Sequence, residues 1–214
     1  LVNIVGDAGI GKSRLLFEFR RRVAAQGVGY IEGRCVSYGG QIPYLPVLDL
    51  IRKGFAITEA DGHEAAAEKI GAVLDALNLD REESAPYLLS LLGFKEETKR
   101  LERLSPEAVK ARTFETLKRV TLRTTQSRPL IIAVEDLHWI DRTSEELLAS
   151  LAESLTGAPV LLVATHRAGY RPPWIEKSYA TQIALPPRWK QYYRRAIGTF
   201  GIARPRRHAL KRAF

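Results

Sequence analysis

The sequence contains one cysteine, no methionine and no long apolar run. Because Cys35 has no second thiol to pair with, it cannot form a disulfide within the chain, and a single thiol does not make a metal site. We expect Cys35 to be a buried thiol at the end of a strand. The uncharged apolar runs fall well below the ~18 residues that a membrane-spanning helix needs. No basic segment precedes the apolar start of the chain, so a signal peptide is not indicated. These absences favour a cytoplasmic protein.

Short apolar runs alternate with helical patterns along residues 1–185. We predict strands at residues 1–5, 28–35, 129–135, 159–165 and 180–185. We predict helices at residues 12–26, 47–55 and 147–155, and a largely helical segment at residues 61–126. Helix starts are indicated by Asp61 with Glu64, by Thr143 with Glu146, and by Ser105–Pro106. The strands are apolar almost throughout, which is typical of a parallel sheet covered on both faces, so the sequence indicates an α/β fold.

The first predicted strand leads into a P-loop pattern, G-x-x-x-x-G-K-[ST], and a helix follows it. The pattern consists of Gly6, Asp7, Ala8, Gly9, Ile10, Gly11, Lys12 and Ser13. Glycines let backbone N–H groups point inward at a phosphate, and the helix adds its positive N-terminal end. We expect Lys12 to neutralise the β- and γ-phosphates of a nucleotide, Ser13 to bind Mg²⁺, and Arg14 to belong to the same binding segment. The alternative is an ordinary glycine-rich turn.

Two adjacent acidic residues, Glu135 and Asp136, lie at the end of the third predicted strand. At such a strand end in P-loop proteins, one acidic residue holds Mg²⁺ and a neighbour can polarise the attacking water. Two carboxylates buried there without a cation would be costly, which favours a metal–nucleotide site. The alternative is a pair of solvated loop carboxylates. We predict Glu135 and Asp136 as catalytic and metal-binding residues, without deciding which of them contacts the metal.

The fourth predicted strand ends in the polar residues 165–167. A polar side chain there can sense the γ-phosphate, and Arg167 can stabilise the charge that develops on it, although a surface arginine is the alternative. Arg112 and Arg142 could each complete a neighbouring site, or simply lie on a solvated helix face. We expect His138 and His166 to be packing or polar-rim residues and not catalysts, and Trp139 to lie in the core or at an interface. The sequence contains no N-K-x-D pattern for reading guanine, so ATP is favoured over GTP.

Four segments in this order resemble one known family: GDAGIGKSRLLFEF, GRCVSYGGQIPYLPVLDLIR, PLIIAVEDLHWID and PVLLVATHR. Residues 1–185 are similar to the AAA-type ATPase module found beside class III adenylate/guanylate cyclase domains in bacteria and in large LuxR-type transcriptional regulators. These modules belong to the STAND branch of P-loop ATPases. The resemblance implies a P-loop NTPase core with a parallel five-stranded sheet in the order 5-1-4-3-2, flanked by helices, and a helical insertion between strands 2 and 3.

The resemblance also implies a switch, in which ATP with Mg²⁺ holds one conformation and slow hydrolysis releases it. It assigns Lys12 and Ser13 to the phosphates and the metal, Glu135 and Asp136 to the Walker B pair, and Arg167 to the sensor position. An effector domain or partner protein outside this chain would deliver the output, and nucleotide-dependent self-association is a further expectation. Two alternatives remain: a nucleic-acid-binding ATPase of the origin-recognition kind, and an inactive pseudo-ATPase fragment.

The two ends of the sequence depart from the family. The family's adenine-contacting segment upstream of the P-loop is not in the sequence, which starts at Leu1 and has no methionine, so we expect a fragment of a longer protein. Residues 1–185 carry 24 basic and 24 acidic residues, whereas residues 186–214 carry nine basic residues and no acid. The net charge of +9 therefore describes a tail. We expect this tail to be disordered and dispensable for nucleotide binding, as an out-of-frame or truncation product, with nucleic-acid or membrane binding as the alternative.

Overall fold

The computed structural model describes residues 1–38 and 42–186, and its centre is one parallel sheet. The sheet has five strands in the order β2-β3-β4-β1-β5. The strands are β1 (Val2–Val5), β2 (Gly29–Arg34), β3 (Leu130–Glu135), β4 (Val160–His166) and β5 (Thr181–Ala184). Read from the other edge, this is the expected order 5-1-4-3-2, so the predicted P-loop NTPase topology is confirmed.

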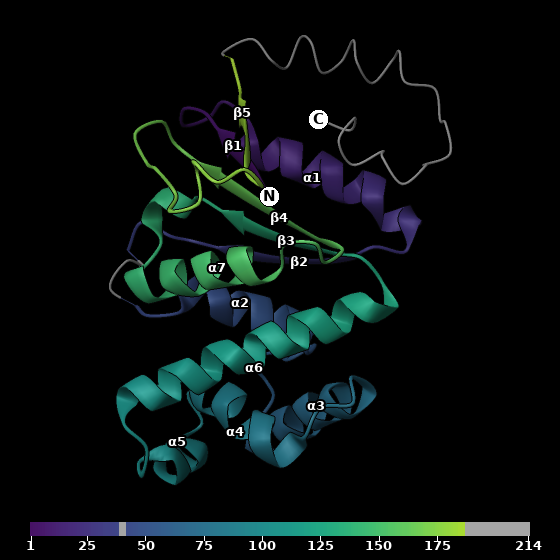
Figure 1. Ribbon diagram of the computed structural model, residues 1–214, viewed down its shortest axis with the longest axis vertical. Helices are drawn as coiled ribbons and strands as arrows, with labels where there is room; N and C mark the ends of the chain where they lie inside the picture. Colours follow the sequence, from purple (N-terminus) through teal and green to yellow (C-terminus); the bar gives the residue numbers. More distant parts are fainter. Residues whose placement is uncertain (39–41, 187–214) are drawn as a thin grey trace.

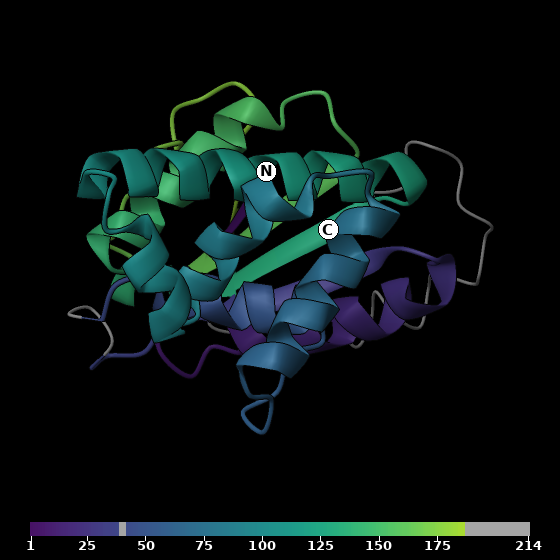
Figure 2. The same cartoon turned by 90° about the horizontal axis from the view of Figure 1, so that it is seen from below.

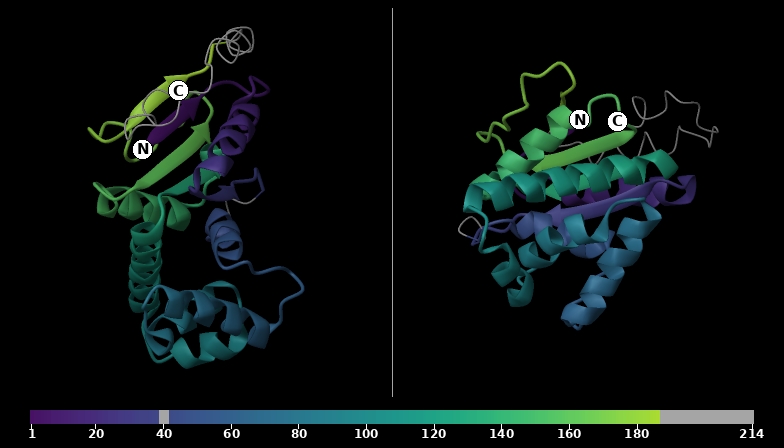
Figure 3. Two further views of the ribbon diagram at one scale, coloured as in Figure 1. Left: turned by 90° about the vertical axis from the view of Figure 1, so that its right-hand side faces the viewer. Right: turned by 60° about the horizontal axis from the view of Figure 1, so that its bottom comes forward.

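Helices cover both faces of the sheet, as the continuous apolar strands predict (Figures 1 and 3). All six residues of β3 are buried, because alternate side chains enter different cores. On one face, Ile131 packs with residues of α1 (Lys12–Val23), which continues into a short 3₁₀ turn (Ala24–Gln26). On the other face, Ile132 packs with Leu50 of α2 (Leu45–Gly54) and Leu148 of α7 (Arg142–Ser154). The sheet is thereby fixed between two helical layers.

The predicted helical insertion lies between β2 and β3 (Figures 1 and 2). After α2 it contains α3 (His63–Ala76), α4 (Arg81–Leu91), α5 (Lys95–Leu101) and α6 (Pro106–Ser127). In Figure 1, α6 runs between the sheet with α7 on one side and the group α3–α5 on the other. A continuous apolar core joins Ile51 of α2, Ile70 of α3, Leu88 of α4, Leu117 of α6 and Leu147 of α7. The insertion is therefore packed onto the nucleotide-binding core.

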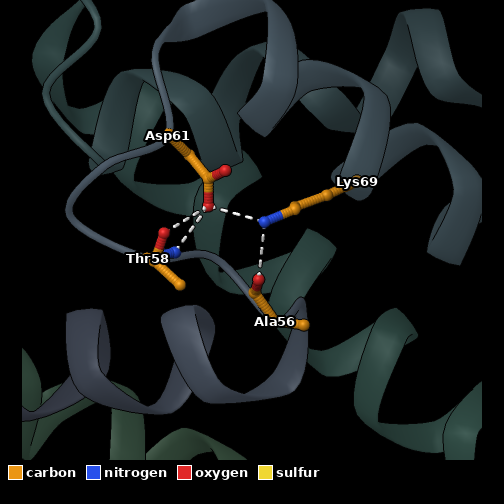
Figure 4. A network of polar contacts seen from close by, with 4 residues as sticks. All are labelled: Ala56, Thr58, Asp61 and Lys69. Atoms are coloured by element: carbon orange, nitrogen blue, oxygen red, sulfur yellow. Dashed lines mark hydrogen bonds and ion pairs between the residues drawn. The ribbon is translucent and has the colours of Figure 1, made fainter.

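Asp61 stabilises the entry to the insertion, but not as the predicted capping box. Gly62 is the N-cap of α3 and provides no side-chain cap. The Asp61 carboxylate instead accepts the backbone N–H of Thr58 at 2.6 Å and is paired with Lys69 at 2.6 Å (Figure 4). Lys69 also donates to the Ala56 carbonyl at 3.0 Å, next to the left-handed turn at Ala56. The hydrogen bond from Lys69 is the main reason why the pKa of Asp61 is lowered to about 2. Asp61 thus joins the α2–α3 turn to the body of α3.

The predicted start of α7 is also corrected. The helix begins at Arg142, and Asp141, not Thr143, is its N-cap, accepting the backbone N–H of Ser144 at 2.9 Å. Glu146 binds Lys110 of α6 and Arg142 instead of closing a capping box. By contrast, the predicted start at Ser105 is confirmed, since its hydroxyl accepts the N–H of Ala108.

The described residues contain no helix that is both long enough and apolar enough to cross a membrane. Apart from Pro186, the basic segment 186–214 lies outside the described residues, so the predicted boundary after residue 185 stays a prediction.

Candidate nucleotide-binding site

The loop that joins β1 to α1 depends on its glycines. Gly9 and Gly11 adopt φ angles of 72° and 113°, in the left-handed region that side chains other than glycine rarely enter. A Cβ atom on Gly6 would lie 2.9 Å from the Ile10 Cγ2 atom. The Gly6 N–H donates to the His166 carbonyl at 3.2 Å, which fixes the start of the loop to the end of β4. The sequence pattern of residues 6–13 therefore corresponds to a tightly folded loop at the N-terminus of α1.

Lys12 is buried within this loop although it is charged. Its side chain is 7% exposed, and its ammonium group donates to the carbonyls of Gly6 at 2.9 Å and Asp7 at 3.1 Å. An ammonium has three N–H donors, so one donor remains for a phosphate oxygen. Asp7 and Ser13 are exposed, which agrees with a loop position facing solvent for Asp7 and leaves the Ser13 hydroxyl accessible.

The predicted acidic pair lies at the carboxyl end of β3. Glu135 is 6% exposed, and its Oε2 atom lies 3.6 Å from the Arg34 guanidinium but has no hydrogen-bond partner among the described residues. Asp136 is partly exposed and leaves the strand in the left-handed conformation, with φ of 56°. Asp tolerates this conformation better than most residues. The buried hydroxyl of Thr165 accepts the Asp136 N–H at 3.0 Å and so fixes the turn.

The sheet order explains why these residues, far apart in the sequence, lie at one edge. Strand β4 pairs in parallel with both β1 and β3, so the carboxyl ends of all three strands meet at the same edge. Ligands of open α/β sheets bind outside this edge. The loop around Lys12, the acidic residues at the carboxyl end of β3 and Thr165 of β4 are thereby placed at one site.

Sequence reasoning missed two residues of this site, Arg34 and Asp49. Arg34 ends β2, and its backbone N–H donates to the Asp49 carboxylate of α2 at 3.3 Å while its guanidinium faces Glu135. The available signal was a cation at the carboxyl end of a strand. It could not be interpreted before the pairing of β2 with β3 placed Arg34 opposite Glu135.

The histidines and the cysteine near the site are packed, as expected. Burial is the main cause that lowers the pKa values of His138 and His166 and raises the pKa of Cys35 to about 12. Both ring nitrogens of His138 are buried and have no hydrogen-bond partner among the described residues. These groups favour their neutral forms.

The arginine predicted as a sensor is exposed. The Arg167 guanidinium lies 5.8 Å from the centre of the Trp139 ring, a cation–π geometry. Arg112 and Arg142 are also exposed, and Arg142 is paired with Glu146 at 3.1 Å. The roles predicted for these three arginines stay predictions.

The donor set fits a magnesium nucleotide. In residues 1–38 and 42–186 there is no group of three or more His, Cys, Asp or Glu side chains that could hold a metal by itself. Mg²⁺ usually takes one or two carboxylates and completes its shell with phosphate oxygens and water. The buried, incompletely paired Glu135 oxygen, the neighbouring Asp136 and the accessible Ser13 hydroxyl are suited to this mode.

The parallel sheet, the glycine loop with its buried lysine and the acidic strand end together define a P-loop nucleotide-binding protein of the α/β class. Comparison with known families agrees with this class, because the model of the AAA ATPase domain matches residues 1–163. The chain belongs to this family of ATPase domains.

A curated relative from Rhizobium meliloti (strain 1021), named "Uncharacterized protein R02095", is 33% identical over 187 residues. The alignment covers 87% of this chain but 18% of the relative. The chain thus spans less than a fifth of the length of the relative that it matches.

Proposed function

We propose that this chain is a regulatory ATPase module that binds ATP with Mg²⁺, hydrolyses it slowly and acts as a switch within a larger signalling protein. The observation that supports the proposal is the placement of the buried Lys12 and the acidic pair Glu135–Asp136 at the same carboxyl edge of one parallel sheet, on either side of β4. The membership in the AAA ATPase domain family supports nucleotide binding independently.

In the proposed site, each polar group has a defined task. The backbone N–H groups of Gly9 and of residues 11–13, together with the free donor of Lys12, bind the phosphates. Ser13 and one carboxylate of the acidic pair hold Mg²⁺, which when bound neutralises the phosphate charge. Asp136 is partly exposed while Glu135 is buried against Arg34, so Asp136 is the acid that water reaches more easily. We assign the orientation of the attacking water to Asp136 and the metal side of the site to Glu135.

The remaining parts of the proposal concern the switch. Arg167 would turn from Trp139 toward the γ-phosphate, and an exposed arginine such as Arg142 or Arg112 would complete the site of a neighbouring copy. Slow hydrolysis by the isolated chain would follow from the absence of that contribution. We assign the output to an effector domain or partner protein outside this chain, and the small share of the relative that the chain covers supports this assignment.

The test compares the parent chain with Lys12→Ala, Glu135→Gln and Asp136→Asn. Lys12→Ala should weaken ATP binding about tenfold to a hundredfold in calorimetry with Mg²⁺, because charge-assisted hydrogen bonds to phosphate are lost. Asp136→Asn and Glu135→Gln should slow phosphate release in single-turnover measurements more than they weaken binding.

The matched control is Lys95→Ala, which removes an exposed lysine at the start of α5 in the insertion. It should bind and hydrolyse ATP as the parent does. Equal ATP affinity of the parent and Lys12→Ala would refute the P-loop assignment, and parental hydrolysis by both acidic variants would refute the Walker B assignment.

A further inference from the structure

A cavity of about 200 Å³ lies where the helical insertion meets the sheet, away from the nucleotide site. Its walls come from the start of β2, from β3, from α2 and α7 of the core, and from α3 and α6 of the insertion. The lining includes Ile51, Phe55, Leu117, Val120 and Leu151. None of residues 6–14, Arg34, Glu135, Asp136 or Thr165 lines it, so the cavity is separate from the proposed ATP site.

The size and the apolar walls of this cavity suit an organic ligand. Protein interiors are close-packed, and voids larger than a water molecule are few. Apolar cavities of roughly 150 Å³ stay dry and accept a benzene ring. The two polar side chains on α6 in the wall, Thr121 and Thr124, already donate their hydroxyls to the helix carbonyls of Leu117 and Val120. The interior of the cavity therefore favours an aromatic or short aliphatic group over water.

The charge of the lining defines the other end of the ligand. Lys53 at the end of α2 and Arg128 after α6 both line the cavity, and both are exposed. Neither has an acidic partner among the described residues, and no acidic side chain lines the cavity there. Lys53 donates to the backbone carbonyl of Glu32 at 2.6 Å, which holds its ammonium group in place without neutralising it. Two unpaired cations at the rim of an apolar cavity attract an anion.

We propose that this cavity is a second ligand site, for a small amphipathic carboxylate with an aromatic or short aliphatic body. The body fills the space between α6 and the sheet, and the carboxylate lies at the rim between Lys53 and Arg128. Because α2, α6 and α7 all contribute to the walls, a bound acid joins the insertion to the nucleotide-binding core.

The experiment uses 3-phenylpropionate as the probe, in calorimetry with the full chain. Two matched compounds separate the two halves of the proposal: 3-phenyl-1-propanol lacks the charge, and propionate lacks the ring. The probe should bind saturably to one site, the alcohol about threefold or more weakly, because partly exposed ion pairs contribute little each. Propionate should show no saturable binding, because it buries too little apolar area.

Two variants test the place of binding. Val120→Phe fills the cavity and should weaken probe binding about tenfold or more, since the ring and the new side chain cannot share the space. The double variant Lys53→Gln/Arg128→Gln, at exposed positions that folding tolerates, should weaken binding of the acid about three- to tenfold and leave binding of the alcohol unchanged. Arg123→Gln, an exposed arginine of α6 outside the lining, is the matched control and should bind as the parent does.

Three results would overturn the proposal: no saturable binding of the probe up to about 5 mM, a folded Val120→Phe variant with parental affinity, or a double charge variant with parental affinity for the acid. If Val120→Phe does not fold, the affinity of the double variant Lys53→Gln/Arg128→Gln for the acid tests the proposal by itself. Because Lys12→Ala should retain parental probe binding, failure of this proposal is distinguishable from failure of the ATP assignment.

Discussion

Thr165→Val removes one hydrogen bond at the centre of the site while leaving its shape unchanged. The Thr165 side chain is fully buried, and its hydroxyl accepts the backbone N–H of Asp136 at 3.0 Å, the residue that adopts the left-handed conformation. Valine has nearly the same shape but no acceptor, so the variant leaves the partly buried N–H without its partner. The expected loss of unfolding free energy is about 1–2 kcal/mol. With a typical urea dependence, the unfolding midpoint should fall by about 0.5–1 M.

The assay for this variant is equilibrium unfolding in urea, followed by circular dichroism, together with Thr165→Ser. Serine keeps the hydroxyl and loses a methyl group, so it separates the hydrogen bond from packing. The Thr165→Val variant should also hydrolyse ATP more slowly than Thr165→Ser, because loss of the hydroxyl leaves Asp136 less well oriented. The reasoning is refuted if Thr165→Val unfolds within about 0.5 kcal/mol of the parent, or if serine destabilises as much as valine.

Two other changes test the fold around the site and the insertion. Gly33→Ala should lower the unfolding free energy by about 1–3 kcal/mol, since the new Cβ atom would lie 2.3 Å from the Pro46 carbonyl oxygen of α2. Gly54→Ala is the matched control, because nothing lies within 4 Å of its Cβ position, and it should leave the unfolding free energy unchanged or raise it. Equal losses of unfolding free energy in the two variants would contradict this packing argument. Asp61→Asn should lower the melting temperature at neutral pH. Because the pKa of Asp61 is depressed from 3.8 to about 2, its contribution is complete above about pH 4 and lost as the pH falls to about 2, where parent and variant should melt alike. A melting-temperature difference between them that does not change with pH would contradict the role of Lys69. The control is Glu59→Gln, which removes an exposed acid of the same turn.

Much of the fold could be predicted because the sequence signals are local. The strand predicted at residues 129–135 ends at the same residue as β3 and starts one residue earlier, and Ser105–Pro106 marks the start of α6 correctly. The helix starts at Asp61 and Thr143 were wrong in detail, because several acceptors stand near each start and three-dimensional contacts decide among them. Lys69 and Thr58 bind the carboxylate of Asp61, and Lys110 of α6 binds Glu146.

The sequence by itself determined the class of this protein, because the P-loop residues and the acidic strand end are contiguous motifs whose chemistry depends on neighbouring positions. Only the tertiary structure decided which distant residues join them. The parallel pairing of β2 with β3 sets Arg34 beside Glu135, and the pairing of β4 with β3 brings Thr165 to Asp136. The cavity between α6 and the sheet likewise arises from packing of segments far apart in the chain, and no local pattern encodes the space that their side chains leave between them.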